Sequence, residues 1–482
     1  MTPPPLLREA DRAAFEAAFA VLAEAALAGA PSPTPLIPGR PGPLVLTQEG
    51  AALEDVLAEM IGEVLPRAAR GDHPRAFGFT PSPASPLSRL GDLLASTFNP
   101  HAGAWPQAEG PLAVERAMIR FMADAGGFPE SAGGLFLAGG SAANLTAVVA
   151  AREARLGPDD TARGVAYLSE ETHVSALKAL RIAGIPDARI RRVALSDNMA
   201  MEPTALAAAV ETDLAAGLKP FIVIATAGST RSGAVDPLPA IADICEPHGL
   251  WLHVDGALGG SALLSPAHRH LLAGVERADS LGWDAHKWLF QTYGCAALLV
   301  RDQETLRRAF AVGPAYLEDA AAGEGEVNAW DLGPEMTRPA RALKLWLTLR
   351  VMGTQAVGSA VAHGFQLVEW AEAALGETPG WKVVSPARMA TLLFRFEDCE
   401  EDERDAVNAA AARRLLDDGY ASVGTARVDG RLTLRICALH PEATEDDMRE
   451  TVRRLDRFAR EAAEARPSSR PQRSGEPGSC AE

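Results

Sequence analysis

The 482-residue chain is poor in several kinds of residue, and each scarcity excludes a class of protein. Its five cysteines form no Cys-x-x-Cys pair, so neither a disulfide framework nor a zinc ribbon is indicated and no metal site is predicted. Positive charge is also scarce, and a formal net charge of −17 would repel nucleic acid and anionic membranes. The first eleven residues lack the basic and apolar regions of a secretory signal. These features predict a cytoplasmic protein that binds neither nucleic acid nor a membrane.

Long hydrophobic runs are missing as well. The longest uncharged stretch, residues 131–151, has the length of a membrane span but contains four glycines, two serines and an asparagine. It is better explained as a strand, a glycine turn and a helix.

Lysine is the scarcest charged residue, which shortens the search for a reactive amine. Four of the five lysines, Lys178, Lys219, Lys344 and Lys382, have the sequence context of surface charges. Lys287 differs, because it follows a predicted strand, where open α/β sheets place their ligands. Tryptophans at 283 and 288 flank it in the sequence and would partly desolvate the amine. Such an environment favours Schiff-base chemistry.

A regular rhythm of β-type runs predicts the fold class. From about residue 130 these runs recur about every 30 residues and alternate with helix-type stretches, as in βα units. They lie near residues 135–137, 165–167, 192–194, 221–224, 251–254 and 279–281. The pattern predicts an α/β domain with a mostly parallel central sheet. Three further β-type runs after residue 380, near 381–384, 391–394 and 432–436, predict a smaller C-terminal α+β domain.

The N-terminal part has a different composition. Two helix-type stretches within residues 11–65 are joined by a connector with six prolines, and their apolar faces need a covering partner. The predicted organisation is an N-terminal helical dimer-clasp segment (1–85), a large α/β domain (86–350), a small α+β domain (351–466) and a disordered tail (467–482).

A glycine turn suggests an anion site. Gly140 and Ser141 follow a predicted strand and open a helix, so backbone N–H groups are available there for a phosphate. The Gly-x-Gly-x-x-Gly and P-loop patterns are absent, which favours a monophosphate over a dinucleotide.

Two further side chains follow predicted strands. Asp255 ends an apolar strand and either caps the next turn or serves as a buried anion that keeps a heteroaromatic nitrogen protonated. His173 follows the strand near residue 168 and offers a planar surface. Together with Lys287 and the glycine turn they supply what a pyridoxal phosphate site requires: a carbonyl trap, a phosphate anchor, a partner for the ring nitrogen and a stacking surface.

At these residues the chain resembles the group II pyridoxal-phosphate-dependent decarboxylases, the family of aromatic-L-amino-acid, glutamate and histidine decarboxylases. The likeness runs from about His73 to about Thr444. Its most specific segments, similar to the family's HVDAA and ADS-x-x-x-N-P-H-K-W, are His253-Val254-Asp255, Ala278-Asp279-Ser280 and Asp284-Ala285-His286-Lys287-Trp288. The resemblance implies a fold-type-I PLP-dependent transferase-like architecture.

The resemblance also implies roles for individual residues. Lys287 forms the internal aldimine, Asp255 pairs with the pyridine nitrogen, and His173 stacks on the ring. The residues implied beside the cofactor are Gly140, Ser141 and His286 at the phosphate, and Thr226. Tyr316 matches a mobile-loop tyrosine that protonates the substrate carbon, which favours an amine product. Asp284 departs from the family's usual asparagine.

The implied function is decarboxylation of an L-amino acid to an amine and CO₂ through a quinonoid, with pyridoxal 5′-phosphate as cofactor. Phe79 and Thr80 lie in a segment that lines the side-chain pocket of aromatic amino-acid decarboxylases, which favours an aromatic or apolar substrate. His101 and Trp105 lie in a second substrate-facing segment, which varies between subfamilies.

Several alternatives stay open. One is decarboxylation of an acidic amino acid, which would need an arginine in the pocket, and another is an aldehyde synthase or other lyase on the same fold. A non-catalytic binding protein is a third. Because homologous enzymes are dimers, a homodimer with its active site at the interface is expected.

Overall fold

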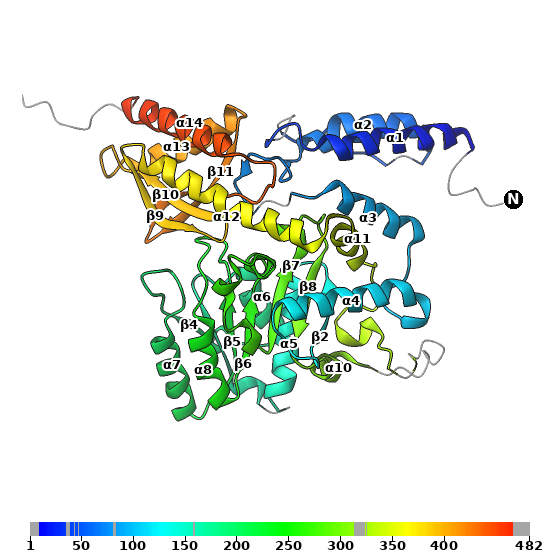
Figure 1. The fold of residues 1–482 in the computed structure, drawn as a ribbon, viewed down its shortest axis with the longest axis vertical. Helices are drawn as coiled ribbons and strands as arrows, with labels where there is room; N and C mark the ends of the chain where they lie inside the picture. The colour runs from blue at the N-terminus through cyan, green and yellow to red at the C-terminus, as the bar shows by residue number, and fades with distance from the viewer. Residues whose placement is uncertain are drawn as a thin grey trace, which may run out of the picture.

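The computed structural model describes residues 9–34, 39–42, 44–46, 48–80, 83–157, 160–312, 323 and 325–465. Two sheets organise these residues, a large one with helices on both faces and a small one beneath the C-terminal helices (Figure 1). A helical arm formed by the N-terminal residues lies beside them (Figure 1).

The large sheet has seven strands in the order β2-β8-β7-β6-β5-β3-β4. Strands β7, β6, β5, β3 and β4 pair in parallel, whereas β8 runs antiparallel to both β7 and β2. The sheet confirms the predicted mostly parallel α/β fold. Its strands are β2 (Gly133–Leu137), β3 (Gly164–Ser169), β4 (Ile190–Val193), β5 (Lys219–Thr226), β6 (Trp251–Asp255), β7 (Ser280–Asp284) and β8 (Ala296–Val300).

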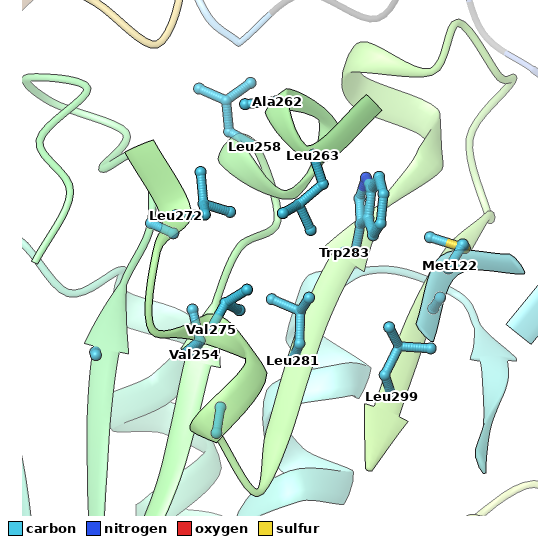
Figure 2. Close-up of a cluster of buried hydrophobic side chains, with 14 of the residues drawn as sticks. Met122, Val254, Leu258, Ala262, Leu263, Leu272, Val275, Leu281, Trp283 and Leu299 are labelled. Atoms are coloured by element: carbon cyan, nitrogen blue, oxygen red, sulfur yellow. The ribbon is translucent and has the colours of Figure 1, made fainter. Parts of the chain in front are cut away.

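Both faces of this sheet are buried, which explains why its strands are almost continuously apolar. Side chains alternate between the faces: Ile222 and Ile224 of β5 pack in one core, and Val223 and Ala225 pack in the other. Figure 2 shows part of the second core, where strand residues such as Leu281 meet the segments that follow β6.

Helices cover the two faces of the large sheet. Helices α5, α6 and α10 contribute to the core that contains Ile222, and α4, α8 and α11 contribute to the core that contains Val223. The helices of this part are α4 (Glu109–Ala125), α5 (Gly140–Arg155), α6 (Val174–Ile182), α7 (Pro203–Ala215), α8 (Leu238–His248), α9 (Ala285–Trp288), α10 (Glu304–Phe310) and α11 (Ala342–Met352).

The small sheet has five strands in the order β1-β11-β12-β10-β9 and its own apolar core. It confirms the predicted C-terminal α+β region. The sheet also includes β1, a two-residue strand from far upstream in the sequence that pairs in parallel with β11. Its elements are β1 (Ala76–Phe77), β9 (Trp381–Arg388), β10 (Thr391–Phe396), β11 (Ser422–Val428), β12 (Arg431–Cys437), α12 (Thr354–Gly376), α13 (Arg404–Asp417) and α14 (Glu445–Glu464).

The N-terminal arm consists of α1 (Arg12–Ala28) and α2 (Leu53–Glu59), next to α3 (Pro86–Phe98) (Figure 1). Within the described residues, no helix combines the length and the apolar character that crossing a membrane requires.

Candidate active site

The carboxyl ends of the parallel strands surround a cavity of ≈ 570 Å³. Most of the residues singled out in the sequence line it. They are Gly140, Ser141, His173, Thr226, Asp255, His286, Lys287, Phe79 and Thr80. Those of the large sheet end or follow a strand whose carboxyl end lies at this edge, whereas Phe79 and Thr80 follow β1 of the small sheet. The strand ends therefore bring together in space groups that are more than 100 residues apart in sequence.

Lys287 lies on the short helix α9 and is the amine of this cavity. Its Nζ is 3.3 Å from Asp284 Oδ2, and His286 Nε2 is 3.5 Å from the same oxygen. The Asp284 side chain is only 3% exposed, so these two side chains rather than solvent are its immediate neighbours. Burial lowers the pKa of His286. The Nδ1 atom of His286 lies 3.0 Å from the Cys295 carbonyl oxygen, which can only accept a hydrogen bond. His286 therefore carries a hydrogen on Nδ1.

The tryptophans beside Lys287 in the sequence do not enclose its amine, contrary to the prediction. Trp283 is buried in the core and donates its indole N–H to Ser261 Oγ at 3.0 Å. Trp288 packs against Phe365 with ring centroids 5.1 Å apart. Neither indole lines the cavity, so the immediate neighbour of the amine is the Asp284 carboxylate.

The start of α5 forms a close-fitting cradle beside Asp284 and His286. A Cβ on Gly140 would lie 3.0 Å from Asp284 Oδ2, and one on Gly139 would lie 3.6 Å from the His286 ring. The first-turn N–H groups of a helix have no partners within the helix, and its dipole favours an anion. The first-turn N–H groups of α5 therefore face the cavity from the segment where the sequence predicts a phosphate.

Asp255 and His173 lie on the sheet side of the cavity. Asp255 Oδ2 accepts a hydrogen bond from Asn144 Nδ2 at 2.9 Å, and Oδ1 accepts one from the Ala257 N–H at 3.2 Å. His173 Nδ1 is 2.7 Å from Ser175 Oγ. Both side chains are therefore held in place by neighbours that the sequence analysis did not single out.

Thr226 places in the cavity a hydroxyl without a hydrogen-bond partner in the part of the chain that the structure describes. Its backbone N–H donates to Asp236 Oδ2 at 2.7 Å, which fixes its position, and burial raises the pKa of Asp236 to about 6. Its hydroxyl, by contrast, is buried and has no hydrogen-bond partner among the described residues, and neither has Asp284 Oδ1. Two orphaned polar atoms in one cavity indicate space for a polar ligand.

Arg435 is the cavity residue that sequence reasoning missed most clearly. It extends from β12 of the small sheet and donates to the carbonyl oxygens of Gly78 and Thr230. The sequence contained a sign of this role, because an arginine is unexpected in the largely apolar strand-type run of residues 432–436. Its contact with the large sheet depends on how the two sheets pack and has no local signature.

The structure separates the two predicted substrate-pocket segments. Phe79, 89% exposed, and Thr80 line the Lys287 cavity. Trp105 lines a different cavity, beside α4, and His101 packs edge-on against Trp330 with ring centroids 6.0 Å apart. Within one chain, His101 and Trp105 are thus not part of the Lys287 cavity. Tyr316 lies outside the described residues.

The residues present fit pyridoxal 5′-phosphate. Lys287 offers an amine, the α5 cradle offers donors to a phosphate, and the Thr226 hydroxyl offers an unused hydrogen bond. Asp255 places a carboxylate where a protonated ring nitrogen would be stabilised.

Comparison with known proteins also points to pyridoxal phosphate as the cofactor. Residues 39–397 match the family described as the pyridoxal-dependent decarboxylase conserved domain. An aromatic-L-amino-acid decarboxylase of Bacillus atrophaeus is 35% identical over 87% of this chain and 88% of its own length. A phenylacetaldehyde synthase of Arabidopsis thaliana is 32% identical over 82% of this chain and 83% of its own.

Solved structures resemble the chain along nearly its whole length. The crystal structure of Oryza sativa TDC with PLP and tryptamine has a TM-score of 0.88 at 29% identity, covering 96% of this chain and all of that one. Catharanthus roseus tryptophan decarboxylase in complex with L-tryptophan gives 0.86 at 26% identity, covering 95% of this chain and all of that one.

Proposed function

The chain belongs to the pyridoxal-dependent decarboxylase family and is a PLP-dependent carboxy-lyase of fold type I, and from this premise we propose that its substrate is an aromatic L-amino acid. The products would be the corresponding amine and CO₂. The observation that carries the proposal is the single cavity in which Lys287, Asp255 and His173 meet the aromatic side chain of Phe79.

When bound, pyridoxal phosphate supplies a carbonyl group and an electron sink for the bond that breaks at Cα. Lys287 would hold the cofactor through its amine, with the carbonyl oxygen lost as water, until the substrate's amino group takes its place. Asp255 would hold a proton on the ring nitrogen through charge, and His173 would stack on the ring. Gly140, Ser141 and His286 would hold the phosphate, with Thr226 beside the ring.

Arg435 would attract the substrate carboxylate. Its guanidinium is held by two backbone carbonyl oxygens and still carries full positive charge into the cavity. A carboxylate entering a cavity whose other charged walls include Asp255 and Asp284 needs such a cation. Arg435 could also bind the side-chain carboxylate of an acidic amino acid, so an acidic substrate stays an alternative. The aromatic relatives and Phe79 favour the aromatic one.

An aldehyde-forming reaction is the second candidate, supported by the phenylacetaldehyde synthase relative. The two outcomes differ in what happens to Cα after CO₂ leaves. Protonation of Cα gives the amine, whereas oxidation by molecular oxygen, which is reduced to hydrogen peroxide, followed by hydrolysis that releases ammonia, gives the aldehyde. We propose that Tyr316 protonates this carbon, with His173 as the other donor. Replacement Tyr316→Phe should then shift the product from amine toward aldehyde, and an unchanged product ratio would remove Tyr316 from this role.

The cofactor linkage can be tested directly. Purified protein reduced with borohydride and digested should carry the cofactor mass on the peptide containing Lys287, and the visible absorption band should be lost in Lys287→Ala. Lys178→Ala changes an exposed lysine on α6 and serves as the control that keeps both signals. A wild-type protein without a cofactor band would contradict the proposal.

We further propose that the enzyme is a cytoplasmic homodimer with its active site at the interface, clasped by residues 1–85. The arm supports this, because Phe15, Phe19, Leu22 and Leu27 of α1 are all exposed although apolar. Unpaired cysteines at the four described positions fit a reducing compartment.

A further inference from the structure

A row of polar side chains crosses one face of the large sheet beneath the active site. Because side chains alternate along a strand, Trp251, His253 and Asp255 of β6 point to the same face, toward α5. Ser280 of β7 lies in register with His253. Asn144 of α5 contacts this row, and its side chain is buried. All of these groups have hydrogen-bond partners, so the positions of their hydrogens can be assigned.

The assignment starts at the end far from the cavity. The Trp251 indole can only donate, and it donates to Ser280 Oγ at 2.8 Å. The Ser280 hydroxyl then donates its own hydrogen to His253 Nδ1, 2.8 Å away. Burial lowers the pKa of His253 to about 4, so the ring is neutral near pH 7 and its hydrogen is on Nε2. That hydrogen is donated to Asn144 Oδ1 at 2.9 Å.

The active-site end of the row requires the same orientation of Asn144. A carboxylate oxygen accepts hydrogen bonds, so the Asn144 amide nitrogen must be the atom that faces Asp255 Oδ2 at 2.9 Å. The second amide hydrogen is donated to Ser175 Oγ, also at 2.9 Å. The Ser175 hydroxyl is therefore free to donate to His173 Nδ1 at 2.7 Å, and the Ser175 backbone N–H approaches the same nitrogen at 3.3 Å. His173 thus accepts at Nδ1, and in its neutral form carries its hydrogen on Nε2.

We propose that Asn144 is a positioning residue that sets the hydrogen positions at both Asp255 and His173. Its two amide hydrogens keep Asp255 as an acceptor and, through Ser175, keep the His173 hydrogen on the ring nitrogen that Ser175 does not occupy. His173 then presents its Nε2–H to the bound substrate as a hydrogen-bond donor. This last consequence rests on the proposed function, whereas the hydrogen positions do not.

The replacement Asn144→Asp tests the assignment because it keeps the shape and removes both amide hydrogens. Ser175 would then donate to the introduced carboxylate, and its oxygen would accept from His173 Nδ1–H. In ¹⁵N-histidine-labelled holoenzyme, with the His173 signals assigned by their loss in His173→Gln, NMR should show the Nε2–H form in the wild type. The variant should shift the tautomer ratio roughly tenfold toward Nδ1–H, as expected for one hydrogen bond. An unchanged ratio would overturn the proposal.

A matched control separates positioning from stability. Asn408 of α13 is as deeply buried and makes three hydrogen bonds, to Phe396 N, Phe396 O and Arg404 O, in the small-sheet core. Asn408→Asp should lower the unfolding temperature and leave the His173 tautomer ratio unchanged. If it shifts the ratio as Asn144→Asp does, the effect is a general loss of packing and the proposal fails.

Two further readouts keep the test decisive. Ser175→Ala breaks only the branch to His173, so it should shift the tautomer ratio and leave the pH titration of the cofactor absorption band unchanged, whereas Asn144→Asp should alter both. If Asn144→Asp does not fold, the Ser175→Ala result alone supports or overturns the His173 branch. The tautomer is read without turnover. A wild type that shows the assigned tautomer but releases no CO₂ from any amino acid would therefore refute the proposed function and leave the assignment standing.

Discussion

A buried ion pair behind the glycine turn offers a quantitative test of the structure. The Arg338 side chain is 0% exposed, and its Nη2 donates to Glu115 Oε1 at 2.7 Å. The same guanidinium donates to the carbonyl oxygens of Ala102 and Phe136, and Glu115 Oε1 also accepts the Phe136 N–H at 2.9 Å. The pair therefore fastens α4 and the segment around Ala102 to β2, the strand that leads into the cofactor cradle.

The expected magnitudes follow from what each replacement leaves behind. Arg338→Met leaves a buried carboxylate without its cation and two carbonyl oxygens without a donor, which should cost about 4 kcal/mol of unfolding free energy. Glu115→Gln keeps the shape but leaves the guanidinium unpaired, which should cost about 3 kcal/mol. The double variant removes both charges, so its loss should be about 4 kcal/mol, well below the about 7 kcal/mol of two additive changes.

Urea unfolding at a fixed protein concentration measures these differences, because an oligomer's stability depends on concentration. The exposed pair Arg414–Glu461, 3.1 Å apart, supplies the control: Arg414→Met should change the stability by less than about 1 kcal/mol. Additive losses in the Arg338 and Glu115 double variant would refute the reasoning, because they would mean that the two charges do not interact.

Two further predictions concern pH and assembly. Burial lowers the pKa of His73 and of His253 to about 4, so the unfolded chain binds these protons more readily, and the stability they contribute above pH 6.5 is lost as the pH falls toward 4. The unfolding free energy should drop by at least about 2 kcal/mol between pH 7.5 and 5, and a His73→Gln/His253→Gln variant with an equally steep pH dependence would contradict this origin. In the arm, Phe15→Glu with Phe19→Glu should place charge on the exposed face of α1 and convert the proposed dimer to a monomer in light scattering, whereas a wild-type monomer would refute the proposed clasp.

Most strands of the large sheet were predicted because each is a short apolar run that is recognisable in the sequence by itself. The run of residues 221–224 is apolar and bounded by helix-type stretches, and buried parallel strands need that pattern on both faces. Strand β8, Ala296–Val300, is just as apolar but was not predicted. Its antiparallel direction between β2 and β7 has no local signature. The two residues of β1 are too few to carry any periodic pattern.

The active site was predictable to the extent that its residues follow strands. Asp255 and Lys287 were found because parallel strands end at a common edge, so that position in the chain implies position in space, whereas His286 was implied by the family resemblance. Arg435 was missed because the small sheet brings it to the cavity, a contact between distant parts of the chain. Asn144 was missed for a different reason: its role depends on hydrogen-bond partners across three elements, which no spacing in the sequence encodes.

The central claim is that this cavity removes CO₂ from an aromatic amino acid. The most direct measurement incubates the purified, cofactor-loaded enzyme with L-tryptophan, L-tyrosine, L-phenylalanine, L-glutamate and L-aspartate separately, and quantifies CO₂ and amine in each reaction. We predict CO₂ and an equal amount of amine from at least one aromatic substrate, neither product from the acidic ones, and no release in Lys287→Ala. Release from glutamate or aspartate alone, or no release from any of the five, would contradict the account.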